Sequence, residues 1–127
     1  MIKRTFNINN YWRVIVYFNI DYNSFSFIAK DIIKIGGNAK MIKRLFNNMY
    51  NKRAKAFTFS SPVKKCSIVG FNTHNDIYDY LNSISHEAEH IKQAMLDAYN
   101  IKDIGEAPAY TVGYLIQIMI KSLKWLD

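Results

Sequence analysis

The chain has 127 residues, of which half are hydrophobic, and carries a net charge of +7. This length predicts a single domain, residues 1–127, with its own hydrophobic core and without a separate substrate-binding lobe. Frequent aromatic residues argue against a disordered chain. The single cysteine, Cys66, excludes an internal disulfide and a cysteine-based zinc finger.

The ends and the charge of the chain predict where it acts. Residues 1–10 contain Lys3 and Arg4 but no cleavage site for a signal peptide, so we expect a cytoplasmic protein. The apolar stretch at residues 112–120 is too short for a transmembrane helix, which needs roughly 20 residues. Lysine and arginine concentrate in residues 40–65, but no helix-turn-helix, RNP-like or zinc-finger pattern accompanies them. We therefore expect a solvated basic surface, with neither nucleic acid nor a membrane as partner, and the oligomeric state stays open.

Hydrophobic patterns predict the elements of the first half in order. Residues 11–20 alternate between apolar and polar side chains, which is typical of a strand. Ser24 is a suitable N-cap for a helix that ends at Gly36 and Gly37, where glycine tolerates left-handed backbone angles. A second helix with a buried apolar stripe is expected over residues 38–50.

The second half predicts a hairpin and two helices. Runs rich in β-forming residues at 54–60 and 64–71 indicate a hairpin, with Gly70 at a bulge. Residues 76–99 follow a helical pattern, and a last helix begins near Glu106, because Pro108 is allowed only in a first turn, and runs to about Leu126. The predicted fold is an α+β domain with a three-stranded, mostly antiparallel sheet and about four helices.

The helix predicted over residues 76–99 contains the run His86-Glu87-Ala88-Glu89-His90, an HExxH motif. Residues four apart on a helix share a face, so the two imidazoles are spaced to bind one metal ion, with Glu87 beside them to activate water. Both histidines fall on the polar face, roughly opposite the apolar stripe. The alternative is that they are incidental on a solvated helix face, since HExxH also occurs by chance.

A catalytic zinc takes three protein ligands, so a third is needed. The metzincin pattern would place a histidine at position 96, which is Leu96. Asp97 lies about 10 Å along the same helix from His90, too far unless the helix ends early. We prefer Glu106, because it follows a connector that lets the chain reverse and begins an antiparallel helix. Asp97 and Asp103 remain the alternatives.

Other residues near these ligands have possible roles at the same site. Tyr110 lies one helical turn beyond Glu106 and is a candidate to hydrogen-bond a developing oxyanion, with ordinary helix packing as the alternative. Gly113 is expected to let the last helix approach the HExxH helix closely. His74, in the loop before that helix, is expected to be a turn residue and not a ligand.

With HExxH followed by the run EAPAYTVGYL from Glu106 onward, residues 76 to about 125 resemble the zincin superfamily, in its gluzincin-like form with glutamate as third ligand. They are also similar to small uncharacterised proteins of bacteriophages and mobile elements with an HE..H then E..AY..GY pattern. The resemblance implies zinc bound by His86, His90 and Glu106, with Glu87 as the catalytic glutamate. It also implies a mostly antiparallel sheet packed on helices. Zincins usually bind an extended peptide along an edge strand, and we expect the second strand of the hairpin to serve.

The sequence therefore predicts a zinc-dependent metallopeptidase that acts on a peptide or protein, with Glu87 as general base and Tyr110 as a further candidate at the site. The alternative is a non-catalytic, zinc-stabilised binding or structural module, such as a virion component or a protein that binds a host factor. Metal binding is the more secure expectation, because larger peptidases complete the cleft with a second lobe that this chain lacks.

Overall fold

The computed structural model describes residues 1–123, which form four strands, four α-helices and one 3-10 helix, η1 (Tyr22–Ser24). The strands are β1 (Ile2–Ile8), β2 (Trp12–Phe18), β3 (Ala56–Ser61) and β4 (Cys66–Phe71). The α-helices are α1 (Phe25–Lys34), α2 (Ala39–Tyr50), α3 (Ile77–Ala98) and α4 (Glu106–Leu123). The predicted α+β class is confirmed, and the predicted end of the last helix near Leu126 lies outside the described residues.

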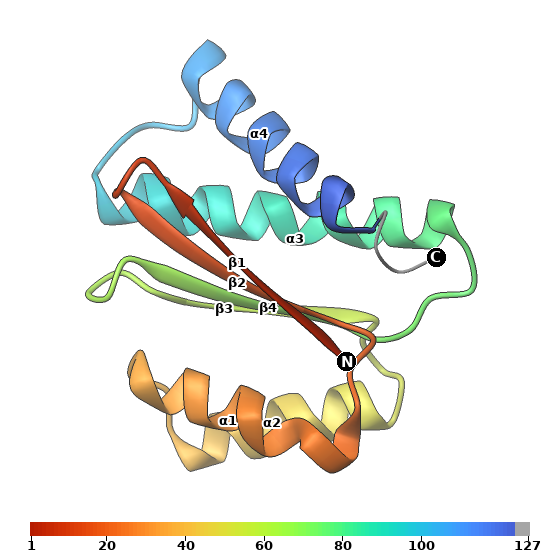
Figure 1. Cartoon of the computed structure of the whole chain (residues 1–127). Helices are drawn as coiled ribbons and strands as arrows, with labels where there is room; N and C mark the ends of the chain where they lie inside the picture. The colour runs from red at the N-terminus through yellow and green to blue at the C-terminus, as the bar shows by residue number, and fades with distance from the viewer. Residues whose placement is uncertain (124–127) are drawn as a thin grey trace.

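The sheet lies between two helical layers, with α1 and α2 on one face and α3 and α4 on the other (Figure 1). Its strand order is β1-β2-β4-β3, one strand more than predicted. The extra strand is β1, whose residues alternate between half-buried and exposed positions. Arg4 occupies one of the half-buried positions and interrupts the apolar alternation, so the sequence pattern did not indicate a strand there.

The pairing of the strands differs from the mostly antiparallel prediction at one point. β1 pairs with β2 and β3 pairs with β4 in antiparallel fashion, but β2 and β4 are parallel. A parallel pair needs a long crossover, and α1 and α2 lie on that connection. The sheet is therefore mixed, with β2 and β4 in its centre.

The edge of the sheet next to the HExxH helix is β3, the first strand of the hairpin. β4 pairs with β2 on one side and with β3 on the other, and all six of its residues are buried. The expectation that the second strand offers a free edge is therefore wrong. Gly70 pairs in register with Phe57, so the predicted bulge is absent there. A Cβ at Gly70 would lie 2.3 Å from the Phe57 ring, which explains the glycine by close packing.

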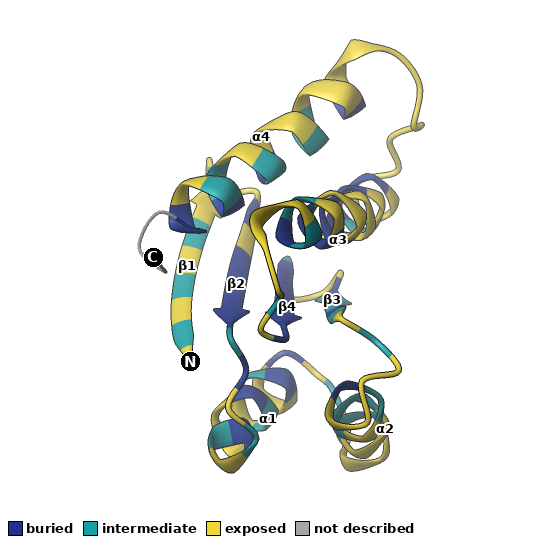
Figure 2. Cartoon of the chain, turned by 90° about the vertical axis from the view of Figure 1, so that its right-hand side faces the viewer, coloured by how far each residue is buried: buried dark blue, intermediate teal, exposed yellow. Residues whose placement is uncertain are grey.

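Two hydrophobic clusters hold the helical layers against the sheet, one on each face. Alternate residues of β2 divide between them, as expected for a strand covered on both sides. Figure 2 shows the result: β2 and β4 are buried, whereas β1 alternates along its length. The side chains of β2 that face α3 and α4 are Trp12, Val14, Val16 and Phe18. Cys66 packs in the other cluster, between the sheet and α1.

The helix ends follow the sequence signals in most cases. The Asn38 and Asp76 side chains cap α2 and α3, and Gly36, with φ of 108°, follows α1. Ser24 differs from the prediction, because its side chain makes no capping hydrogen bond to α1. Asp21 caps η1 immediately before it. None of the helices in residues 1–123 is long and apolar enough to cross a membrane.

A polar contact beneath α1 ties this helix to the sheet. The Tyr17 hydroxyl donates a hydrogen bond to the Asp31 carboxylate, and Lys3 Nζ lies 2.9 Å from the same carboxylate. Burial by itself would raise the pKa of Asp31, but the bonds from Tyr17 and Lys3 hold this pKa below its usual value. Burial and the neighbouring carboxylate raise the pKa of Tyr17. Asp31 is therefore ionised and paired at neutral pH.

Candidate functional site

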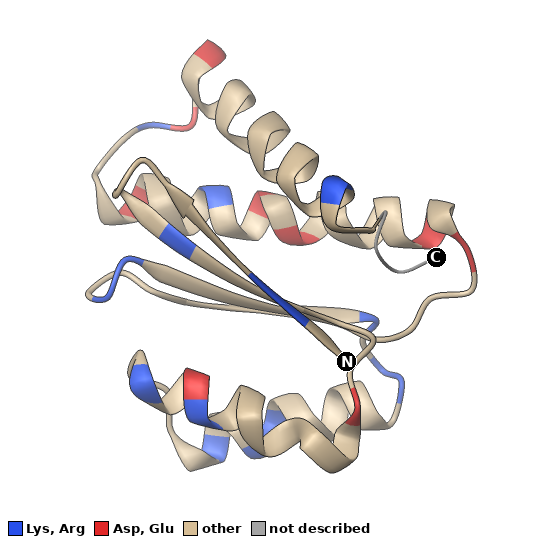
Figure 3. Ribbon diagram, in the orientation of Figure 1, with Lys and Arg blue, Asp and Glu red and all other residues tan. Residues whose placement is uncertain are grey.

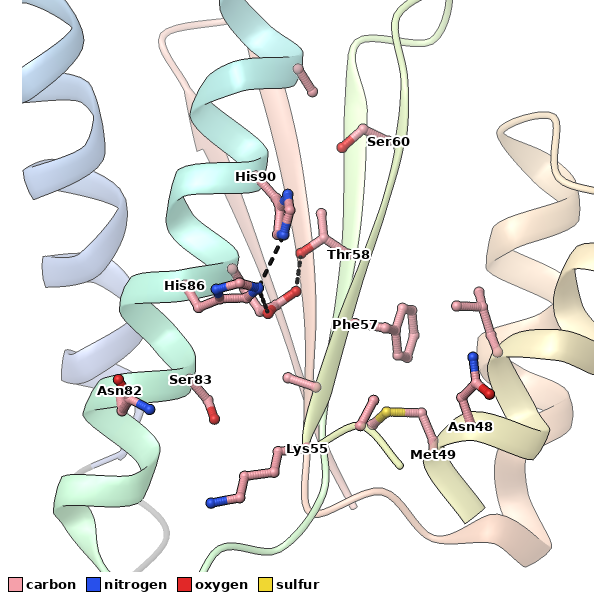
Figure 4. A pocket seen from close by; sticks show the side chains of 15 residues that line it. Asn48, Met49, Lys55, Phe57, Thr58, Ser60, Asn82, Ser83, His86 and His90 are labelled. Atoms are coloured by element: carbon pink, nitrogen blue, oxygen red, sulfur yellow. Dashed lines mark hydrogen bonds and ion pairs between the residues drawn. The ribbon is translucent and has the colours of Figure 1, made fainter. Parts of the chain in front are cut away.

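The two histidines of the HExxH motif lie one turn apart on the exposed face of α3 and point toward β3 (Figure 4). Their Nε2 atoms are 3.1 Å apart, and the rings meet edge to face with centroids 4.7 Å apart. The His86 side chain is 70% exposed. The predicted placement of both imidazoles on one solvent-accessible face is confirmed, and their Nε2 atoms lie within hydrogen-bonding distance of each other.

Glu87 differs from its histidine neighbours because it is buried, with only 4% of its surface exposed. The Thr58 hydroxyl of β3 donates a 2.9 Å hydrogen bond to Glu87 Oε1, while Oε2 lies 3.9 Å from His86 Nε2 (Figure 4). A carboxylate at this depth needs a hydrogen-bond donor. The sequence carries one signal for this burial: Glu87 stands three residues after Ile84 and four before Ile91, within the buried stripe.

These side chains face a cleft of about 690 Å³ that follows the edge strand of the sheet. One wall is α3, with both histidines and Glu87; the other includes β3 and residues of α2. Thr58 is the residue of this site that the sequence reasoning missed, because no local pattern joins positions 58 and 87. The contact arises when α3 packs over β3.

The histidine pair matches the spacing of two zinc ligands. Zinc binds imidazole nitrogen at about 2.0–2.1 Å, and tetrahedral geometry then separates two such nitrogens by about 3.3 Å. The observed 3.1 Å between the Nε2 atoms is close to this value. No group of three or more His, Cys, Asp and Glu side chains within residues 1–123 is arranged to hold a metal. The pair therefore has the spacing of two zinc ligands, without a third such ligand beside it among the described residues.

The structure does not bring Glu106 to the pair. Glu106 is the first residue of α4 and is exposed. α3 continues to Ala98, about 12 Å beyond His90, before the connector begins. α4 then starts away from α3 and approaches it only further along, where its buried residues concentrate (Figure 1). Glu106 is accordingly not among the residues that line the cleft.

The two alternative third ligands have other partners. Asp97 accepts a 2.9 Å hydrogen bond from the Gln93 amide. Asp103 lies 2.9 Å from Lys92 Nζ, and Glu89 also accepts from this ammonium. These two carboxylates raise the pKa of Lys92 and tie the connector to α3. Neither aspartate lines the cleft.

The remaining predicted residues also lie elsewhere. Tyr110 is 73% exposed and lines a separate apolar groove that includes Tyr99 and Tyr114. A Cβ on Gly113 would meet no atom within 4 Å, so the predicted close helix approach at this residue is wrong. His74 bonds to the Asn72 carbonyl at 2.6 Å and to the Ser83 hydroxyl at 2.7 Å. It therefore closes the loop before α3, as expected for a structural residue.

The described residues thus bring His86, His90, Glu87 and Thr58 together and leave Glu106 and Tyr110 apart from them. The resemblance to zincins rests on the HExxH spacing and on the residues that follow it. No protein-family model, curated protein or solved structure matches this chain.

Proposed function

We propose that this protein is a zinc-dependent, metallopeptidase-like hydrolase in which His86 and His90 bind the metal and Glu87 is the general base. The observation that supports this proposal most is the geometry of the motif. Two imidazole nitrogens 3.1 Å apart face an open cleft, and a buried carboxylate lies beside them. Glu87 lies in the buried stripe of α3 and accepts a hydrogen bond from Thr58 of β3, which holds its carboxylate beside the histidine pair.

The residues divide the chemistry between them. Zinc, when bound, supplies a Lewis acid that makes water nucleophilic at neutral pH and polarises a carbonyl. Glu87 accepts the proton of the attacking water and delivers it to the leaving amine. The Thr58 hydroxyl donates a 2.9 Å hydrogen bond to Oε1 of Glu87, and Oε2 of the same carboxylate lies on the side of His86. This bond fixes the orientation of the carboxylate before a substrate arrives.

The substrate class follows from the position of β3 beside the site. β3 is the last strand of the sheet order, so its outer edge presents backbone N–H and C=O groups that an extended peptide can pair with. The same cleft contains β3 residues and both histidines. We therefore propose a peptide or protein segment as substrate, bound along β3 in place of the second hairpin strand expected from the sequence.

Metal content per chain is the first test, on protein purified without a histidine tag. We expect one zinc in the wild type and none in His86→Ala or His90→Ala. Gln93→Ala is the matched control, because this exposed residue lies one turn beyond His90 on the same helix and should leave the metal in place. Wild-type protein without metal after zinc is supplied would refute the proposal.

The zinc content of Glu106→Ala tests whether Glu106 is the third zinc ligand. Glu106 is the ligand that the sequence predicts, and loss of zinc in this variant would support that assignment. Retention of one zinc would show that the histidine pair and groups within the cleft suffice.

Cleavage of an unstructured protein such as casein separates catalysis from binding. Glu87→Gln should keep the zinc and lose cleavage, because an amide cannot accept the proton. The same experiment distinguishes the non-catalytic alternative. Zinc binding by wild type and Glu87→Gln, without cleavage by either, would establish that alternative.

A further inference from the structure

A second cleft, of about 460 Å³, lies at the opposite end of the fold from the start of α3. The β1–β2 turn, the β3–β4 turn and the C-terminal end of α1 surround it (Figure 1). Its lining contains four cations and two amide side chains and no carboxylate: Arg13, Lys34, Lys64, Lys65, Asn7 and Asn10. This composition differs from the first cleft, where Glu87 stands between the histidines and β3.

The fold holds these cations together from separate segments. Arg13 pairs across the sheet with Asn7 of β1 on one side and Cys66 of β4 on the other. Its backbone N–H donates a 2.9 Å hydrogen bond to the Lys65 carbonyl, which attaches the β3–β4 turn to the start of β2. Lys34 approaches from the last turn of α1. Sheet register and the end of α1 thus fix the backbone positions from which these cations extend.

The cations of this cleft form no salt bridge among the described residues. None of the salt bridges within residues 1–123 includes Arg13, Lys34, Lys64 or Lys65. The acid nearest in sequence to Lys34 is Asp31, whose carboxylate is paired with Tyr17 and Lys3 and also attracts the more distant Lys34 ammonium. Lys65 Nζ lies 4.5 Å from the centre of the Tyr99 ring, a contact that leaves its charge uncompensated. Like charges held together in this way favour a bound anion.

The charge of the whole chain reinforces this local field. Of the 17 Lys and Arg residues, 13 precede residue 76, together with only two of the 10 Asp and Glu residues. Figure 3 shows the division: blue segments outnumber red ones in the sheet and the α1–α2 layer, whereas most red segments lie on α3, the connector to α4 and the start of α4. The cleft therefore lies in a region of positive potential that steers anions toward it.

The lining also indicates which anion fits. Ile35 and Cys66 are buried and form an apolar floor, where charge–charge attraction is stronger than in bulk water. Arginine and lysine bind phosphate oxygens through charge-assisted hydrogen bonds, and the two asparagine amides add neutral donors. We propose that this cleft binds the phosphate group of a phosphorylated ligand. The proposal is independent of the proposed hydrolase function, because the two clefts share no residue.

Titration calorimetry with pyrophosphate tests the site, with potassium chloride at matched ionic strength as the blank. The pocket variant combines Lys34→Gln with Lys64→Gln, and the control combines Lys40→Gln with Lys43→Gln on α2. All four lysines are exposed, and both variants lose the same net charge. We expect the Kd for pyrophosphate to rise at least about tenfold in the pocket variant and to stay within about twofold in the control. Circular dichroism checks that both variants are folded.

Three results would overturn the proposal: an equal loss of affinity in both variants, unchanged affinity in a folded pocket variant, or no saturable binding to the wild type.

A competition experiment with a 12-nucleotide single-stranded DNA identifies the source of the phosphate. Displacement of pyrophosphate by the oligonucleotide, with a steep salt dependence, would assign the site to nucleic acid phosphates. Binding of pyrophosphate without displacement would assign it to a small phosphorylated molecule.

Discussion

Replacing Thr58 by valine tests whether the buried carboxylate of Glu87 depends on the edge strand. The substitution keeps the branched shape and removes the hydroxyl that donates the 2.9 Å hydrogen bond to Glu87 Oε1. A hydrogen bond to a charged group contributes about 1.5–3 kcal/mol, and Glu87, at 4% exposure, has little contact with solvent that could replace the bond. We expect Thr58→Val to lower the free energy of unfolding by about 1.5–3 kcal/mol at pH 7. Urea denaturation measures this difference.

Two variants separate the hydroxyl from other effects of the substitution. Thr58→Ser keeps the donor and should lose less than about 1 kcal/mol. Thr5→Val makes the same change at an exposed position of β1, the other edge strand, and should lose nothing measurable. A double-mutant cycle of Thr58→Val with Glu87→Leu should give a coupling energy above about 1 kcal/mol. Coupling near zero would refute the pairing of these side chains.

Two further predictions concern the fold. Gly70→Ala should destabilise the protein by about 1–3 kcal/mol, because its Cβ would lie 2.3 Å from the Phe57 ring. Gly113→Ala, where the added Cβ meets open space, should stabilise the protein by about 0.5–1 kcal/mol. The opposite order of stabilities in urea denaturation would contradict the packing described above. The pKa of Asp31 in the folded protein is below its ordinary value of 3.8. The contribution of Asp31 to the free energy of unfolding is therefore complete above pH 3.8 and is lost as the pH falls through the folded-state pKa. In a series of urea titrations, the stability difference between wild type and Asp31→Asn should therefore be constant from pH 5 to 7 and shrink toward pH 2. A difference that grows on acidification would contradict the lowered pKa of Asp31.

The elements that the sequence predicted well are those specified by neighbouring residues. The starts of α2 and α3 near Asn38 and Asp76 were predicted from helical periodicity, and the structure adds that both side chains cap their helices. The end of α1 was predicted from Gly36 and Gly37, and Gly36 has the left-handed backbone expected there. The exposed position of His86 and His90 also follows from local spacing, because a helix sets the direction of residues four apart. Capping, turn chemistry and helical periodicity act within one or two turns of the chain, so a single sequence contains them.

What only the tertiary structure decided depends on segments far apart in the chain. The parallel pairing of β2 and β4 moves the free edge to β3, although both hairpin strands have similar composition. Glu87 is buried because α3 packs over β3 and brings Thr58 to it. The separation of Glu106 from the histidines follows from the course of α4 after the connector. Strand order, helix crossing and contacts across the sheet are set by burial of the whole hydrophobic core, which no local pattern encodes.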